Sequence, residues 1–230
     1  MRLTWFFLLT FCVVSSSAQA GEEDLYDFLW LDPDKTVYVL QNKVHPKDGS
    51  FYVDLNYVIN TTSTFQDTIG TQLNTGYFFT EQWGLEFSYM SYSNTDNSTL
   101  KSVESVAGLA PFVRRPVESI SVFAIYSPFY GKINTFNKIF YFDWSFGAAL
   151  GTYKMESNLE TSELTDQNRY DEENYNTLQL KTTFKVHMNR NIHLGIQFLN
   201  TNFMSNSPST PNSTSWDYNN DLVIGLGVSF

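Results

Sequence analysis

Runs of alternating side chains occupy most of this chain after residue 50, and they restrict its fold more than any other feature. In the clearest run, residues 140–148, four aromatic side chains alternate with polar or small ones: Phe140, Phe142, Trp144 and Phe146 against Tyr141, Asp143, Ser145 and Gly147. A period of two is typical of a β-strand with two different faces. About eight such runs follow one another, at residues 51–60, 69–79, 83–89, 119–126, 140–148, 178–187, 192–198 and 222–230. The sequence therefore predicts an all-β protein.

The two faces of these runs separate a membrane barrel from a soluble β-sandwich, whose strands also alternate. One face is bulky and apolar, whereas Gly, Ser, Asn and Gln recur on the other. Aromatic residues gather near the run ends, as the girdles at two membrane interfaces require; they are Tyr77, Phe79, Trp83 and Phe140 at one end and Tyr57, Tyr89, Trp216 and Tyr218 at the other. We therefore expect a transmembrane antiparallel up-and-down β-barrel of about eight strands, residues 50–230.

The lengths of the connections predict the orientation of this barrel. Outer-membrane barrels join their strands by short turns on the periplasmic side and by longer loops outside. The second and sixth connections, Thr80–Gln82 and Met188–Asn191, are short, and the fourth is assigned to Ser127–Asn137, with Pro128 and Gly131 as turn residues. Long segments lie at 91–117, 151–175 and 200–215. Both ends of the barrel chain are therefore expected in the periplasm.

The first 20 residues have the pattern of a secretory signal peptide, with Arg2, an apolar run and an Ala18-Gln19-Ala20 cleavage site. We expect cleavage after Ala20; a lipoprotein cut before Cys12 is disfavoured by the bulky Phe11. Cleavage removes the only cysteine, so the mature chain can form no disulfide or thiolate site. Loss of Arg2 takes the formal net charge from −10 to −11, which argues against nucleic-acid binding. No later apolar run has the length of a membrane helix.

Residues 21–49 lack the alternation and form a separate leader. The leader begins with an acidic, aromatic stretch, Glu22–Trp30, and contains the short apolar run Thr36–Leu40 between two prolines. We expect a short periplasmic extension, partly packed under the barrel. Acidic tails are usually solvated, and a partner-binding motif is the alternative.

The C-terminal run ends in an aromatic residue behind alternating apolar ones: Ile224, Leu226, Val228 and Phe230. It resembles the C-terminal signal of bacterial outer-membrane barrels, and this resemblance implies the barrel-assembly machinery as a partner through Phe230. The alternative interpretation is an edge strand at the end of a soluble domain, but its exposed apolar residues would promote aggregation.

Several short segments also resemble the outer-membrane β-barrel domain family of bdellovibrios and myxobacteria. They are Val39–Lys43 with Lys47, Gly76–Trp83, Ser127–Lys132 and Phe142-Asp143. Small OmpA/OmpX-type barrels are similar in size. The resemblance implies a barrel and an outer-membrane location, but it implies no particular activity.

The polar face of the runs carries ionisable groups that an eight-stranded barrel would enclose, because its interior is just wide enough for its own side chains. These groups are Asp54, Glu86, Asp143, Lys181, Lys185 and His187. Buried charges must be paired, so we expect an internal ion-pair network with Asp143 at a depth between Lys181 and Lys185. A proton or solute path is the functional alternative.

Two further features of the sequence are candidate sites. The acidic segment Glu156–Glu173 could collect divalent cations but has no calcium-loop spacing, and it is expected to be a solvated loop, like the Asn-rich stretch 202–219. Of the three histidines, His187 and His193 could approach each other across a hairpin, yet near the periplasmic turn. Chemistry at the outer rim would need a histidine there, so no catalytic, cofactor-binding or metal-binding residue is assigned, and no cofactor is expected.

The function predicted from the sequence is a non-enzymatic outer-membrane protein with an envelope-structural or surface-interaction role and a filled interior. A narrow transport pore and, less favoured, a membrane-embedded barrel enzyme are the alternatives. The expected surroundings are outer-membrane lipid and lipopolysaccharide. Whether the chain forms homo-oligomers is left open.

Overall fold

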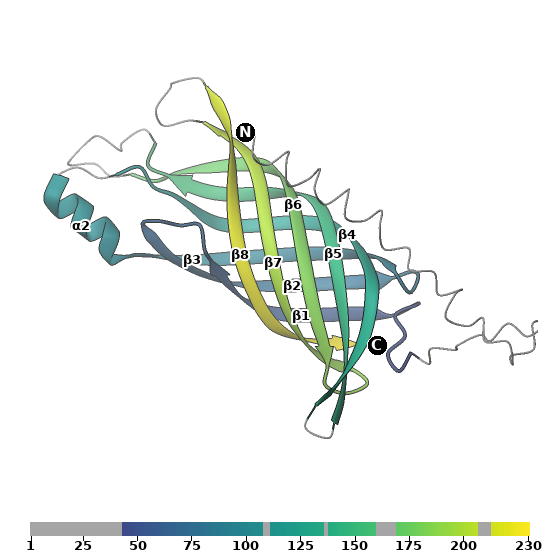
Figure 1. Ribbon diagram of the computed structural model, residues 1–230. Coiled ribbons are helices and arrows are strands. Elements are labelled where there is room, and N and C mark those ends of the chain that lie inside the picture. Colours follow the sequence, from purple (N-terminus) through teal and green to yellow (C-terminus); the bar gives the residue numbers. More distant parts are fainter. Residues whose placement is uncertain (1–42, 108–110, 136–137, 160–168, 207–212) are drawn as a thin grey trace, which may run out of the picture. The chain divides into compact units, whose positions relative to one another are not determined.

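The computed structural model describes residues 43–107, 111–135, 138–159, 169–206 and 213–230. Eight antiparallel strands pair in sequence order, and β1 also pairs with β8, so the sheet closes into a barrel (Figure 1). The strands are β1 (Phe51–Asn60), β2 (Gln66–Phe78), β3 (Trp83–Asp96), β4 (Arg114–Thr135), β5 (Lys138–Ser157), β6 (Asp171–His187), β7 (Ile192–Asn206) and β8 (Thr214–Ser229). The predicted fold class is confirmed. The predicted signal peptide, residues 1–20, and residues 21–42 of the predicted leader lie outside the described residues.

Along most of their length the strands point polar residues into the barrel and apolar residues outward. In β2, Gln72 and Asn74 are buried, whereas Ile69, Leu73 and Tyr77 are exposed. A barrel in water would show the reverse arrangement, because its apolar side chains would gather inside. An apolar belt around a polar interior is the arrangement of a membrane-spanning barrel. Among the described residues, no helix has the length and apolar character needed to cross a membrane.

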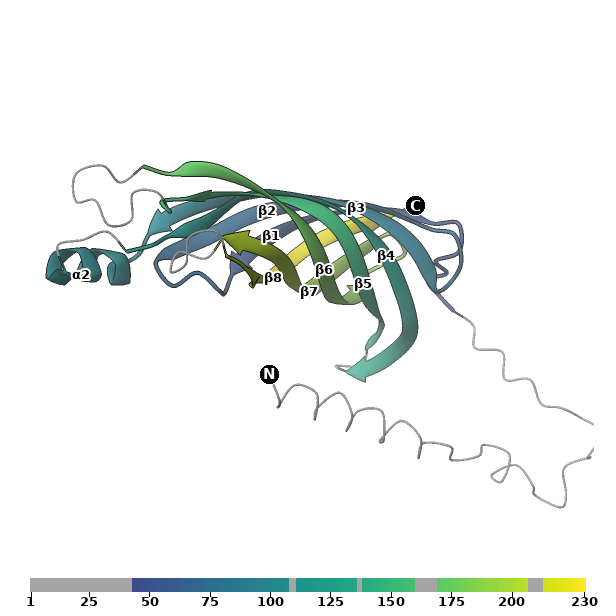
Figure 2. The ribbon, with the colours of Figure 1, turned by 90° about the horizontal axis from the view of Figure 1, so that it is seen from above.

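The two ends of the barrel differ. At one end, which we call the inner end, lie the tight β2–β3 and β6–β7 turns and the C-terminus. At the opposite, outer end lies the helix α2 (Ser98–Ala107) in the β3–β4 connection (Figure 2). Asn97 begins this helix: its side chain accepts a hydrogen bond from the Leu100 backbone N–H at 3.0 Å, as an N-cap residue does.

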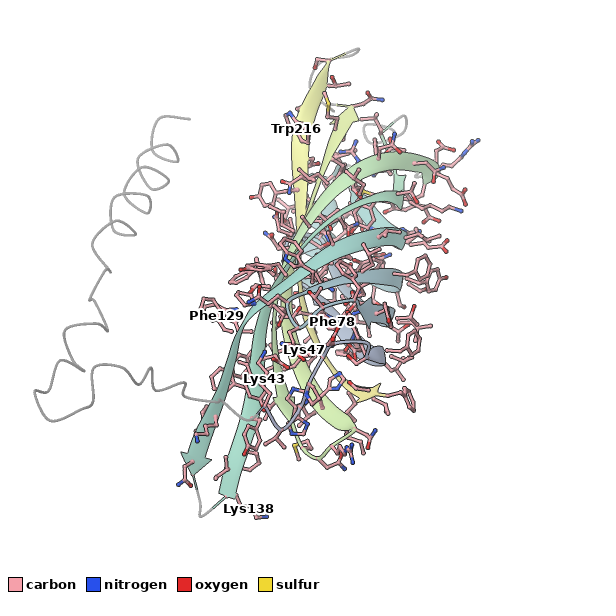
Figure 3. The ribbon with its side chains drawn as sticks, turned by 90° about the vertical axis from the view of Figure 1, so that its right-hand side faces the viewer. Lys43, Lys47, Phe78, Phe129, Lys138 and Trp216 are labelled. Carbon is pink, nitrogen blue, oxygen red and sulfur yellow. The ribbon has the colours of Figure 1, made fainter. Side chains whose placement is uncertain are left out.

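The fourth connection was predicted wrongly. Instead of a turn over 127–137, β4 continues to Thr135 and pairs with β5 from Phe129↔Trp144 to Thr135↔Lys138. Pro128 lies at a register shift between Tyr126 and Phe129, where a proline does not interrupt the ladder. The Ser-Pro and Gly residues that indicated a turn mark a β-bulge, and the β4–β5 hairpin extends past the other inner turns, with Lys138 at its far end (Figure 3).

The outer loops are also shorter than predicted. Strands β3, β5 and β7 continue past residues 91, 151 and 200 to Asp96, Ser157 and Asn206. At these strand ends the polarity of the two faces is reversed: Tyr153, Met155 and Phe203 are buried in an apolar cluster, while backbone pairing persists. The apolar outward face by which the other strands were identified is therefore missing there.

Candidate functional site

Among the described residues, a cavity lies at each end of the lumen. The inner cavity has a volume of about 370 Å³, and its walls include Tyr52, Glu86, Asp143, Lys181 and His193. The outer cavity has about 210 Å³, with Gln66, Arg114, Phe203 and Asn219 among its lining residues. The ionisable residues predicted to face inward all line the inner end of the lumen or lie beside it.

Three carboxylates in the inner half of the lumen each have a lysine partner. Glu86 pairs with Lys181, and both side chains are only 3% exposed; the Tyr52 hydroxyl also donates to Glu86 at 2.6 Å. Asp54 lies 2.7 Å from Lys185 Nζ and 2.7 Å from His193 Nε2. The expected ion-pair network is therefore present. Paired charges with further hydrogen bonds are the arrangement that makes such burial tolerable.

Asp143 pairs with neither of the two lysines between which it was expected to lie. In the β5–β6 register Asp143 stands opposite Lys185, yet Lys185 pairs with Asp54 on β1. Asp143 instead contacts Lys47 Nζ at 2.5 Å and His187 Nε2 at 2.7 Å. The lumen is narrow and a lysine side chain is long, so β6 lysines reach the opposite wall rather than the adjacent strand. Gly147, opposite Lys181, leaves room for this: a Cβ there would lie 3.0 Å from the lysine side chain.

Lys47 belongs to residues 43–50, which we call the inner strap, and sequence reasoning gave it no site role. Its backbone N–H donates to Glu81 at 3.2 Å, and its ammonium also donates to Ser127 Oγ at 2.8 Å. Lys43 pairs with the same Glu81 at 3.0 Å. Burial raises the pKa of Glu81, but the Lys43 hydrogen bond and two backbone N–H donors outweigh it, so the pKa lies below its ordinary value. Figure 3 shows the strap at the barrel mouth.

All three histidines of the chain gather at this mouth. His187 and His193 are register partners with ring centroids 6.0 Å apart, which confirms their predicted approach. His45 of the inner strap stacks on His187 at 4.3 Å with the rings nearly parallel. The sequence could not show this third contact, because the leader has no periodic pattern that places its side chains.

Ser229, His193 and Asp54 form a short chain, but its geometry differs from that of a hydrolase triad. Ser229 Oγ lies 3.3 Å from His193 Nδ1, and Asp54 contacts Nε2, the reverse of the usual use of the two nitrogens. The Ser229 backbone N–H donates to the Asn191 carbonyl at 2.7 Å, so it is not free to stabilise an oxyanion. We interpret the chain as structural. Among the described side chains, no group of three or more His, Cys, Asp or Glu could hold a metal ion.

Between the two cavities the lumen is filled by apolar and amide side chains. Val58, Phe123, Leu199 and Val223 are fully buried there, and Met90 is nearly so. Next to them Gln72 accepts hydrogen bonds from Asn56 at 3.0 Å and from Gln197 at 2.6 Å. We call Val58, Met90, Phe123, Leu199 and Val223 the apolar layer. It separates the inner cavity from the outer one.

The acidic segment Glu156–Glu173 was predicted wrongly where the structure describes it. Its two ends are the end of β5 and the start of β6, and three of their carboxylates are paired with cations outside the segment: Glu156 with Arg115 at 2.7 Å, Glu172 with Lys154 at 2.8 Å and Glu173 with Arg114 at 3.1 Å. The pairing of β4 with β5 and of β5 with β6 places these cations next to the carboxylates. Residues 160–168 lie outside the described residues.

The fold and its apolar belt define a class: this is a small eight-stranded β-barrel of the outer-membrane type. No family model and no curated protein matches the sequence. Among solved structures, Neisserial surface protein A is similar, with 16% identity, a TM-score of 0.51 and coverage of 80% of this chain and 100% of that one. The N-terminal barrel of Pseudomonas aeruginosa OprF (11% identity, TM-score 0.47, coverage 80% and 98%) and OprG from the same organism (15%, 0.45, 81% and 98%) are also similar.

At these identities the likeness concerns the fold alone. The resemblance to the bdellovibrio and myxobacterial family stays a prediction.

Proposed function

We propose that the protein is a closed, non-enzymatic barrel of the outer membrane with an envelope-structural or surface-interaction role. The observation that carries this proposal is the apolar layer, whose side chains have almost no exposed surface. An ion or solute path needs continuous hydration, and a layer of packed apolar side chains leaves no room for water. The charged groups below it are neutralised in pairs, so they do not form a selectivity lining.

The outer end supplies the surface for an interaction. Trp216 of β8 is 68% exposed, and Val106 of α2 is 88% exposed. The β7–β8 hairpin continues past its neighbours, with Met204 opposite Trp216. Exposed apolar side chains above the membrane belt are a common feature of contact surfaces. The partner they would meet is either another macromolecule or the lipopolysaccharide around the barrel.

The proposal includes a route to the membrane. The signal peptide is cleaved after Ala20, residues 21–49 stay in the periplasm, and the assembly machinery recognises the last strand through Phe230. Phe230 is exposed at the inner end, while its backbone N–H donates to the Phe51 carbonyl at 2.8 Å and closes the barrel. Its ring is thus available to a periplasmic partner before closure.

Single-channel recording in a planar lipid bilayer tests the proposal. The mature protein is refolded, its folded state is verified by its heat-modifiable mobility in gel electrophoresis, and a general porin added afterwards shows that the bilayer reports openings. We expect no discrete openings from the protein itself. Reproducible openings would overturn the closed-barrel proposal and favour the narrow pore, with the inner charges as its lining.

A further inference from the structure

The inner strap is held at the barrel mouth by groups that respond differently to protons. Its contacts to Glu81 are with a partly exposed carboxylate, whereas Lys47 reaches the buried Asp143. His45 lies on His187, which itself contacts Asp143. Asp143 is therefore shared between a lysine on the strap and a histidine on the barrel.

The strap is connected to β1 through a residue that can act as a hinge. Gly49 has a φ of +72°, a left-handed conformation that favours glycine, and no atom lies within 4 Å of where its Cβ would be. Residues 43–48 precede this point, while the Gly49 backbone N–H is fixed to the Phe78 carbonyl at 2.9 Å. Release of the strap would break the hydrogen bonds from the Ser50 N–H (2.9 Å) and the Ser50 hydroxyl (2.6 Å) to the Lys47 carbonyl, but it would leave the β1 ladder from Phe51 onward intact.

From these contacts we propose that the inner strap is a proton-released latch: protonation of His45, whose ring stacks on His187, undocks Lys47 from Asp143 and opens the inner cavity to the periplasm. A positive charge on His45 is disfavoured in this partly buried stack, where the two ring centroids lie 4.3 Å apart. The new charge would also add to the charges of Lys43 and Lys47 on the same short strap. Histidine is the side chain that titrates in this range.

Titratable and charged groups from several elements surround the pair. They are Asp143 and Tyr141 from β5, His193 from β7, Tyr130 from β4, Arg190 from the β6–β7 turn, the C-terminal Phe230, and Lys43, Lys47 and Asp48 from the strap itself. Asp54 and Lys185 sit one step deeper and neutralise each other. Among the described residues, Asp143 is the carboxylate in direct contact with the pair, and Lys47 already neutralises it, so a proton on His45 adds uncompensated positive charge there.

The direction of the pH effect follows from His45. Burial and the neighbouring His187 lower the pKa of His45 below its ordinary 6.5, against the raising effects of the Arg190 backbone and Asp143. The docked state therefore binds the proton more weakly than the released state. Docking is therefore most favourable above the ordinary histidine pKa and weakens as the pH falls below it, by at most about tenfold per pH unit for each proton taken up.

Nitroxide mobility measured by electron paramagnetic resonance tests the latch in the refolded, membrane-embedded protein. The label is placed on Val44→Cys, because Val44 is an exposed strap residue next to His45 and the mature chain has no other cysteine. We expect an immobilised spectrum at about pH 8 and a mobile one at about pH 5, with unchanged β-sheet circular dichroism.

Two matched variants identify the sensor and the anchor. His45→Phe keeps a ring to stack on His187 but cannot bind a proton, so its label should stay immobilised at both pH values. Lys47→Met removes the contact with Asp143, so its label should be mobile at both. The proposal is overturned if the unsubstituted strap has the same mobility at both pH values, or if His45→Phe is released as readily as the parent.

Discussion

Individual side chains decide how the charges inside this barrel are balanced. Lys181 and Lys185 both cross the lumen to carboxylates on β3 and β1 rather than pairing with the adjacent β5. Lys47 reaches Asp143 from outside the sheet altogether. The three ion pairs are therefore not equivalent: two are fixed between strands, and the third depends on a segment that can move.

This difference predicts unequal costs of removing a carboxylate. Glu86→Gln leaves Lys181 charged in a closed interior, and we expect the free energy of unfolding to fall by about 3–5 kcal/mol, as for other broken buried pairs. Asp143→Asn should cost clearly less, because Lys47 can leave with the strap and regain water. Urea unfolding in detergent micelles, followed by tryptophan fluorescence, measures both variants.

The exposed Glu104 of α2 offers the control for this comparison. Glu104→Gln should leave the unfolding curve unchanged, since exposed charges contribute little. Equal losses for Glu86→Gln and Asp143→Asn would contradict the distinction between a fixed pair and a movable one.

At the scale of elements, the β4–β5 hairpin stands apart from the rest of the sheet. Beyond Tyr126, β4 has no β3 partner, and β5 before Tyr141 has no β6 partner. The segment Lys132–Thr135 therefore pairs only within the hairpin. Phe129 at its base is different, because it packs on Trp144 at 5.6 Å within the outward aromatic face.

The end of this hairpin should therefore be dispensable for folding. Replacing residues 133–140 with Asn-Gly keeps the Lys132↔Tyr141 pair and closes it with a favoured two-residue turn. We expect the shortened protein to refold with the heat-modifiable mobility and the circular dichroism spectrum of the parent.

Failure of the shortened protein to refold would show that the hairpin end takes part in barrel assembly. A Phe129→Ala variant, by contrast, removes a ring from the aromatic face and should lower stability. The pair distinguishes the projecting end of the hairpin from its base.

For the whole molecule, the two ends define its orientation. Short turns and the C-terminus occupy the inner end, and α2 the outer end. In outer-membrane barrels the short turns face the periplasm. The apolar layer then separates a cavity on the periplasmic side from one on the external side.

Cysteine labelling on intact cells checks this orientation. Glu104→Cys on α2 should react with a polymer-linked maleimide too large to enter porins. Gln82→Cys, on the exposed β2–β3 turn, should react only after the outer membrane is permeabilised. Both side chains are exposed in the structure, so accessibility alone does not distinguish them. The opposite labelling pattern would show that the barrel is inserted in the opposite orientation.

Much of the barrel follows from the sequence because a strand's two faces meet two different solvents. In β2, for example, the outward Ile69, Leu73 and Tyr77 alternate with the inward Gln72 and Asn74. Lipid outside the barrel favours apolar side chains, and the packed polar interior favours polar ones, so the alternation is visible in the sequence. The same local signal placed the β2–β3 and β6–β7 turns. It failed at Pro128, where the residues of a turn and of a bulge are alike.

Only the tertiary structure decided which charges meet. The sequence determined a closed eight-stranded barrel and the inward direction of Asp54, Glu86 and Asp143, because these depend on neighbours along one strand. The pairing of Lys181 with Glu86 depends on the lumen width, and the positions of His45 and Lys47 depend on how an aperiodic strap folds back over the mouth. Such contacts join residues far apart in the chain, and no local pattern encodes the distance across a barrel.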